Sequence, residues 1–180
     1  MSLWSPAVLD IGTITPWSLE SIGSALTMQG GTVLTSAATA AYPAANDAIF
    51  VPFWLSQPIL VKKLFLNTGA TSSGNVDVGI YDEKLTKLVS AGSTLMGSAN
   101  VLQEFDIADT LIGPGLFYLA IAVDNTTGTL IKGQAADVGR LRALGVAKMA
   151  TAFPLPATAT LAAVTADYIP LFGLTTKTVI

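Results

Sequence analysis

Apolar and polar positions alternate along much of the chain from about residue 48 onward. In the segment 76–81 the positions of one face hold valine and isoleucine, and in the segment 104–108 phenylalanine and isoleucine alternate with acidic residues and alanine. The segment 117–124 continues the alternation, with large apolar side chains on one face. A period of two residues is typical of a strand that buries one face. We therefore predict a strand in each of these three segments.

Four further segments are rich in β-branched or apolar residues and are bounded by turn-forming residues. The segment 60–66 carries the pair Lys62 and Lys63, which indicates a strand with one solvated position or a strand at a sheet edge. A fifth segment, 136–150, is not assigned to one type of structure, because it fits a helix or a pair of strands equally well. The other predicted strands are 88–94, 129–132 and 168–175, of which the last closes the fold.

The predicted strands follow one another at intervals of roughly 10 to 12 residues, with turn chemistry between them. Such intervals leave no room for the crossover helices of a parallel sheet. Gly74 ends a turn that requires a positive φ, and Gly79 leaves room within its strand for a neighbouring side chain or a bulge. We predict an all-β fold, an antiparallel β-sandwich over residues 46–180, with a closed barrel as the alternative.

Residues 1–45 differ from the rest of the chain in composition and pattern, and we predict that they form an extended N-terminal arm. The first 61 residues contain no lysine or arginine and only three acids. A low-complexity disordered tail is one interpretation, and a short helix over residues 18–28 is another local expectation. Because two of the three tryptophans lie in the first 17 residues, we favour an arm that docks on a neighbouring subunit. The expected interface residues are Trp4, Leu9, Ile11 and Trp17.

Composition narrows the classes of protein to which the chain can belong. Its 180 residues suffice for one domain with a hydrophobic core. Only 12% of the residues are charged and 51% are apolar, so the surface either consists of small neutral residues or is partly covered by a partner. No run of about 18 apolar residues is present, and the start lacks the basic region of a secretory signal, so we expect neither a membrane span nor export. The net charge of −3 and the scattered basic residues disfavour nucleic acid as a partner.

Cysteine and histidine are both absent from the sequence. This excludes disulfides, zinc sites with Cys or His ligands, and Ser-His-Asp or Cys-His catalysis. Glycoside hydrolysis would need two carboxylates about 5 to 9 Å apart, but we expect the acids to be solvated charges on the outer faces of strands. No EF-hand pattern is present, and Asp106, Asp109 and Asp124 would be the oxygen ligands of any loop-bound calcium. We predict no enzyme, no metal and no cofactor. The candidate acids for hydrolysis are Asp77, Asp82, Glu83, Glu104, Asp106 and Asp109.

Three segments carry distinctive motifs: 74–82 reads GNVDVGIYD, 87–93 reads KLVSAGS and 113–120 reads GPGLFYLA. Together they resemble a jelly-roll-like β-sandwich module of phage virion structural proteins. The resemblance spans about residues 52–132 and describes a scaffold without chemistry. It implies a location in a virion, as a capsid decoration, minor capsid, tail or fibre component. The partners that it implies are other virion proteins and further copies of the chain, and a trimer is one such homo-oligomer.

Carbohydrate binding for host-surface or glycan attachment is the alternative function. Sandwich modules bind glycans through exposed aromatic rings that stack on sugar faces, and the fold alone does not decide between the two functions. The candidate rings are Trp54, Tyr81 and Tyr118. For Trp54, core or interface packing is the competing interpretation, and only the exposure of the side chain separates the two.

Overall fold

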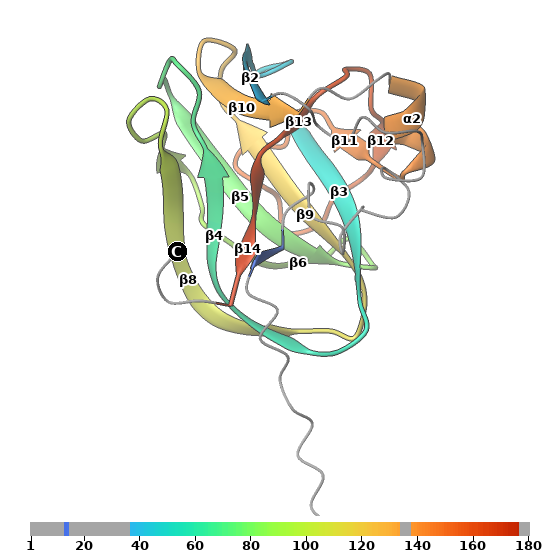
Figure 1. The fold of residues 1–180 in the computed structure, drawn as a ribbon. Coiled ribbons are helices and arrows are strands. Elements are labelled where there is room, and N and C mark those ends of the chain that lie inside the picture. Colours follow the sequence, from blue (N-terminus) through green and yellow to red (C-terminus); the bar gives the residue numbers. More distant parts are fainter. Residues whose placement is uncertain (1–12, 15–36, 134–137, 177–180) are drawn as a thin grey trace, which may run out of the picture.

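The computed structural model of the protein describes residues 13–14, 37–133 and 138–176 (Figure 1). These residues form an all-β sandwich with one short helix, which confirms the predicted fold class. In chain order the elements are β1 (Thr13–Ile14), β2 (Ala37–Ala41), β3 (Ala48–Leu55), β4 (Ile59–Asn67), β5 (Asn75–Asp82), β6 (Lys87–Ser90), β7 (Thr94–Leu95), β8 (Leu102–Ile112), β9 (Gly115–Val123), β10 (Thr129–Gly133), α2 (Val138–Ala143), β11 (Ala147–Met149), β12 (Ala162–Ala163), β13 (Ile169–Pro170) and β14 (Phe172–Thr175).

The strands form three sheets in which all the pairings are antiparallel. The seven-stranded sheet has the order β12-β11-β3-β9-β5-β6, with β7 beside β5. The four-stranded sheet has the order β1-β14-β4-β8, and the three-stranded sheet has the order β13-β10-β2. Strands that are neighbours in space are therefore often distant in the sequence.

The main core lies between the seven-stranded and four-stranded sheets. Inward-facing side chains of β3, such as Val51 and Phe53, belong to one buried cluster with Leu64 of β4, Leu119 of β9 and Leu174 of β14. The cluster follows from the alternation in the sequence, because every second residue of these strands faces the opposite sheet. Burial of these apolar side chains is the main stabilising contribution to the fold.

A two-stranded ribbon links the two main sheets at one corner of the molecule. Strand β3 pairs with β9 in the seven-stranded sheet, and β4 pairs with β8 in the four-stranded sheet. The pairing continues on both sides of the corner, because Leu55 lies opposite Gly115 and Ile59 lies opposite Ile112. The connections β3 to β4 and β8 to β9 therefore turn together from one sheet to the other (Figure 1).

A second, smaller core lies on the outer face of the seven-stranded sheet. Strands β11 and β12 pair with each other, and the residues between them, 150–161, cross that face; we call this segment the strap. Buried Leu155 of the strap belongs to one cluster with Phe50 of β3, Tyr81 of β5 and Ala120 of β9. Both faces of the central strands are therefore covered by apolar side chains over part of their length.

Several predicted strands differ from the observed ones at points that have a local cause. The strand predicted at 60–66 is observed as β4, but it lies between β14 and β8, so the edge-strand alternative is wrong. The segment 136–150 contains both a helix and a strand, separated by Gly145 with a φ of 80°. The predicted strand 88–94 is interrupted at Gly92, whose φ is 70°. The predicted strand 168–175 divides at Leu171, and its halves β13 and β14 join different sheets.

Part of the predicted arm contributes to the described sandwich. Residues 37–41 form β2, which pairs with β10 along its whole length. The following Tyr42 is buried, and its hydroxyl donates a hydrogen bond of 2.8 Å to the carbonyl of Ile121. The helix expected over residues 18–28 lies outside the described residues.

The role predicted for Gly79 is confirmed by its surroundings and gives a first test of the strap packing. A Cβ atom at this position would lie 2.9 Å from Leu155 Cδ1, 2.9 Å from Ser90 Cβ and 3.0 Å from the Val89 carbonyl oxygen. We expect Gly79→Ala to lower the free energy of unfolding by about 1–3 kcal/mol, because an overpacked interface must shift. Chemical denaturation measures the change. An unchanged midpoint would mean that the strap does not press on β5.

Candidate interaction surface

The corner ribbon is made from two segments without charge. Residues 48–61 and 110–123 contain no aspartate, glutamate, lysine or arginine. They supply β3, the start of β4, the end of β8 and the whole of β9, which are the strands that turn together at the corner. A charge-free surface of this kind loses little favourable hydration when it is covered.

Large apolar side chains are exposed on the outer side of this corner. Trp54 is 63% exposed and lies opposite Leu116, and Leu111 is 62% exposed and lies opposite Leu60. The alternate residues of the same strands face inward and are buried in the main core. The ribbon is thus apolar on both of its sides, and its inward side is buried in the main core. We call Trp54, Leu60, Leu111 and Leu116 the corner patch.

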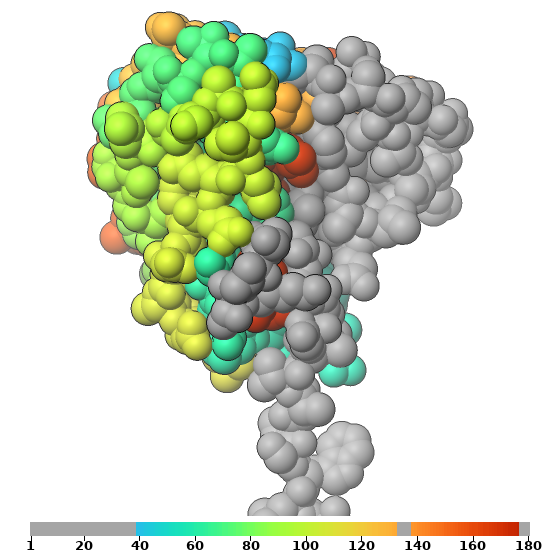
Figure 2. Space-filling model, turned by 60° about the vertical axis from the view of Figure 1, so that its left-hand side comes forward, coloured from blue at the N-terminus to red at the C-terminus, as the bar shows by residue number. Residues whose placement is uncertain are grey.

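Figure 2 looks toward β8, drawn in yellow-green, which is an edge strand of the four-stranded sheet. Leu111 lies near the end of this strand, next to the corner. Acidic residues occupy the strand further from the corner, where Glu104 and Asp106 lie opposite Phe65 and Lys63. Asp109 lies between these acids and Leu111 and is also exposed, so β8 carries acids up to two residues from the corner patch.

The three aromatic residues proposed for glycan contact have different environments. Trp54 is exposed, so packing in the core of its own chain does not explain this residue. Tyr118 is half-buried on the same outer face, two positions along β9 from the partner of Trp54, which makes the two rings diagonal neighbours. Tyr81 is fully buried, donates a hydrogen bond of 2.6 Å to the Pro156 carbonyl and contacts the Phe50 ring edge-on. Tyr81 therefore offers no open ring face to a ligand.

The residues predicted to anchor the arm, Trp4, Leu9, Ile11 and Trp17, all lie outside the described residues. Their predicted role at a subunit interface remains a prediction. The corner patch is separate from these residues and was not identified from the sequence. The lack of charge in 48–61 and 110–123 was its only sequence signal, because a tryptophan between apolar neighbours is equally compatible with the core.

Two of the predicted acids form ion pairs on the outer face of the four-stranded sheet. Lys63 Nζ lies 2.6 Å from Glu104 Oε2 and 3.3 Å from Asp106 Oδ1. The hydrogen bond to Glu104 raises the pKa of Lys63, and the nearby Asp106 acts in the same direction. Both acids are thus paired with a lysine of the neighbouring strand.

Two other acids hold turns in place. Asp82 Oδ1 accepts hydrogen bonds from the backbone N–H groups of Lys84 and Thr86, at 2.9 and 2.8 Å. Asp124 accepts a 2.9 Å hydrogen bond from Asn75 Nδ2. Although partial burial opposes it, hydrogen bonding to Asn125 and Asn75 lowers the pKa of Asp124. These contacts are typical of turn chemistry.

Asp77 contradicts the prediction that the acids are solvated. The alternation of β5 places it on the outer face as expected, but it is 0% exposed because the strap covers it. Its Oδ2 accepts a 3.0 Å hydrogen bond from the Leu155 N–H, whereas its buried Oδ1 has no hydrogen-bond partner. Burial raises the pKa of Asp77, and the bond from Leu155 only partly offsets this effect.

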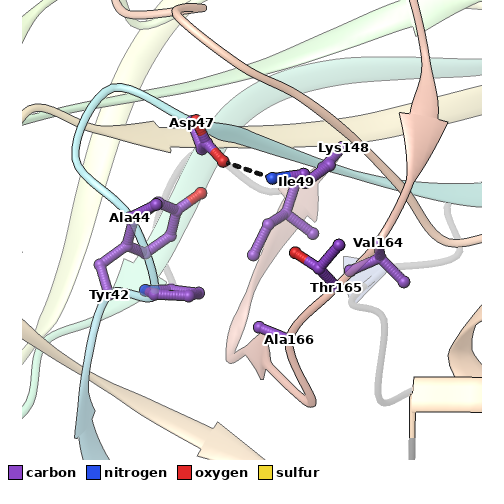
Figure 3. A pocket seen from close by; sticks show the side chains of 9 residues that line it. Tyr42, Ala44, Asp47, Ile49, Lys148, Val164, Thr165 and Ala166 are labelled. Carbon is purple, nitrogen blue, oxygen red and sulfur yellow. Dashed lines mark hydrogen bonds and ion pairs between the residues drawn. The ribbon is translucent and has the colours of Figure 1, made fainter.

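A small pocket lies at another site, between the loop after β2 and the segment after β12 (Figure 3). Its volume is about 90 Å³, and its walls include Tyr42, Ile49 and Thr165. The ion pair of Asp47 and Lys148, at 2.9 Å, lies beside it. Ligand sites usually occupy about 300–1,000 Å³. The pocket therefore has room for a few water molecules or one small side chain, and not for a sugar.

Within residues 13–14, 37–133 and 138–176, no group of three or more acidic side chains is close enough together to hold a metal ion. None of the described helices is long and apolar enough to cross a membrane. No protein-family model matches the chain, and no curated protein shows significant sequence similarity to it.

Proposed function

We propose that the protein is a non-enzymatic structural subunit that packs its apolar corner against other subunits of a large assembly, of the phage virion type. The corner patch is the observation that carries the proposal. Trp54 and Leu111 are each more than 60% exposed on a ribbon without charges. An apolar patch on an otherwise folded sandwich is a typical contact surface.

Physical considerations favour association through this patch. Burial of apolar surface contributes about 25 cal/mol per Å², and a tryptophan at the centre of an interface is among the strongest contributors to affinity. The segments 48–61 and 110–123, which carry the patch, contain no charge that would have to be desolvated, and the nearest charges along β4 and β8 are Lys62 and Asp109. The corner patch thus combines exposed apolar side chains with a small desolvation penalty when a partner covers them.

The virion assignment is supported by the resemblance of segments 74–82, 87–93 and 113–120 to phage structural modules and by the sandwich fold. A capsid decoration, minor capsid, tail or fibre component fits this description. Both other virion proteins and further copies of the chain are proposed partners, and the trimer is one arrangement. Localisation in the virion follows from the same proposal.

The test is the molar mass of the full chain in solution, measured by light scattering behind a sizing column at several concentrations. For a self-associating subunit, we expect Leu111→Asp to weaken association roughly 30-fold, which corresponds to about 2 kcal/mol at an interface anchor. Leu95→Asp is the matched control. Leu95 is 70% exposed but lies on β7, beside the end of β5 that is remote from the corner. An equal loss in both variants would contradict a contact centred on the corner.

A monomeric wild-type chain would direct the same test to a different partner. Incorporation into particles would then be compared among the wild type, Leu111→Asp and Leu95→Asp. A deletion of the N-terminal arm can be added to this comparison. The deletion should end at residue 36, because residues 37–41 form β2 of the sandwich. Normal incorporation of Leu111→Asp would remove the corner from the proposed mechanism.

Carbohydrate binding is kept as a second candidate because Trp54 and Tyr118 lie on one outer face as diagonal neighbours. A glycan array probed with the wild type, Trp54→Ala and Leu111→Asp separates the two candidate functions. A stacking site would lose binding in Trp54→Ala and keep it in Leu111→Asp. Packing through the corner would be weakened by both substitutions.

A further inference from the structure

Three side chains of β5 and β6 form hydrogen bonds with two residues of the strap: one accepts from it and two donate to it. The Leu155 N–H donates to Asp77 Oδ2 at 3.0 Å, and Lys87 Nζ donates to the Leu155 carbonyl at 2.6 Å. The Tyr81 hydroxyl donates to the neighbouring Pro156 carbonyl at 2.6 Å. Backbone bonds from Lys87 to Ala157 and from Ala159 to Leu85 continue the contact. The strap is thus attached to the sheet at one concentrated point.

Asp77 is the unfavourable member of this attachment. It is fully buried, and its Oδ1 has no hydrogen-bond partner. The Ser90 hydroxyl approaches Oδ2 at only 3.5 Å, which adds little. An ionised carboxylate with an unpartnered oxygen carries a desolvation penalty that it loses as soon as water reaches it. Detachment of the strap would admit that water.

We propose that Asp77 is a pH-sensitive latch, which holds residues 150–161 firmly when its carboxyl group is protonated and weakly when it is ionised. The strap contains no charged residue. The charged and titratable groups near Asp77 are Lys87 of β6 and Tyr81 of its own strand. Lys87 favours the ionised carboxylate but does not form an ion pair with it, because its Nζ is bonded to the Leu155 carbonyl.

The direction of the pH dependence follows from the two states of the strap. Burial raises the pKa of Asp77 in the closed state. Opening of the strap would expose the carboxyl group to water and return its pKa toward the ordinary value. The closed state therefore binds the proton more tightly. Closure is strongest below the ordinary pKa of the carboxyl group and weakens as the pH rises through the raised pKa.

The latch would regulate the corner, a step that rests on the proposed function. The strap covers Phe50, which lies on the same outer face of β3 as Trp54, four residues away. Detachment of the strap would uncover Phe50, Ala120 and Ala122 beside the corner patch and so enlarge the apolar surface available to a second copy. Association is expected to strengthen from pH 4.5 to pH 7.

Hydrogen–deuterium exchange of the full chain between pH 4 and pH 8, corrected for the intrinsic pH dependence, tests the latch. We expect protection of residues 150–161 to fall severalfold in the wild type as the pH rises, because the closed state binds the proton more tightly than the open state. Protection in β9 should not fall with it. Asp77→Asn, which keeps an acceptor for the Leu155 N–H but cannot ionise, should show constant protection. Asp109→Asn, at an exposed acid of β8, is the control and should behave as the wild type.

Two results would overturn the latch: the same fall in Asp77→Asn, or an equal fall in β9, which would indicate global destabilisation. Exchange is measured on dilute protein and does not depend on association through the corner patch. The latch can therefore be disproved while the proposed function stands, and the proposed function can be disproved while the latch stands. Molar mass at pH 4.5 and pH 7 tests the regulatory step. If protection of the strap changes with pH but the molar mass of the wild type does not, then the latch does not regulate association through the corner patch.

Discussion

Phe50→Ala is expected to lower the free energy of unfolding by about 3–5 kcal/mol, which is the usual cost of removing a large buried aromatic side chain. Trp54→Ala, four residues later on the same face of β3, is expected to cost less than about 1 kcal/mol. The two positions share a strand and a face, but Phe50 is 0% exposed beneath the strap and Trp54 is 63% exposed. Denaturant unfolding followed by circular dichroism measures both.

This contrast separates stability from interaction. If Trp54 is an anchor for another subunit, its removal should weaken association while the isolated sandwich stays folded. Similar losses of stability in the two variants would mean that Trp54 is packed within its own chain. The interpretation of the corner as a free contact surface would then be wrong.

Gly74→Ala is expected to be the most damaging of the turn substitutions. Gly74 has a φ of 72°, and a Cβ atom there would overlap the Asn125 amide and the Asp124 carboxylate. The left-handed backbone alone costs a residue with a side chain about 1–2 kcal/mol. Displacement of Asn125, which also bonds the Ser73 carbonyl at 3.0 Å, should add about 1–3 kcal/mol.

Gly92 provides the control for this prediction, because it has nearly the same φ of 70° and open space around its missing Cβ. Gly92→Ala should therefore show the backbone cost without the overlap. Thermal unfolding of the two variants isolates the difference. Equal shifts would mean that the loop near Asp124 yields without loss, and that the hydrogen bonds there contribute little to stability.

The sequence was most informative where one face of a strand alone decided its structure. The alternation in 76–81 and 117–124 identified β5 and β9 and their inward-facing residues, because a buried face requires a period of two. The positive φ of Gly74 was predicted from turn chemistry and is confirmed. These features depend on residues that are close together in the chain.

Features that depend on distant segments were not predictable in the same way. The strap has no periodicity, since Pro154 and Pro156 interrupt it, so nothing indicated that it would cover Asp77. The division of 168–175 between two sheets depends on which strands lie nearby. The exposure of Trp54 results from its place beyond the end of the strap, which no local pattern encodes.

The corner ribbon also has a consequence for how the chain reaches its fold. Its pairs, such as Leu55 with Gly115 and Ile59 with Ile112, join positions that are far apart in the sequence. Contacts of this kind form slowly, because a long loop must close before they contribute. Until then, two charge-free apolar segments remain unpaired and open to other chains. The same lack of charge that suits the finished corner to a partner therefore makes the newly made chain prone to aggregation, and its yield should depend on dilution and on chaperones.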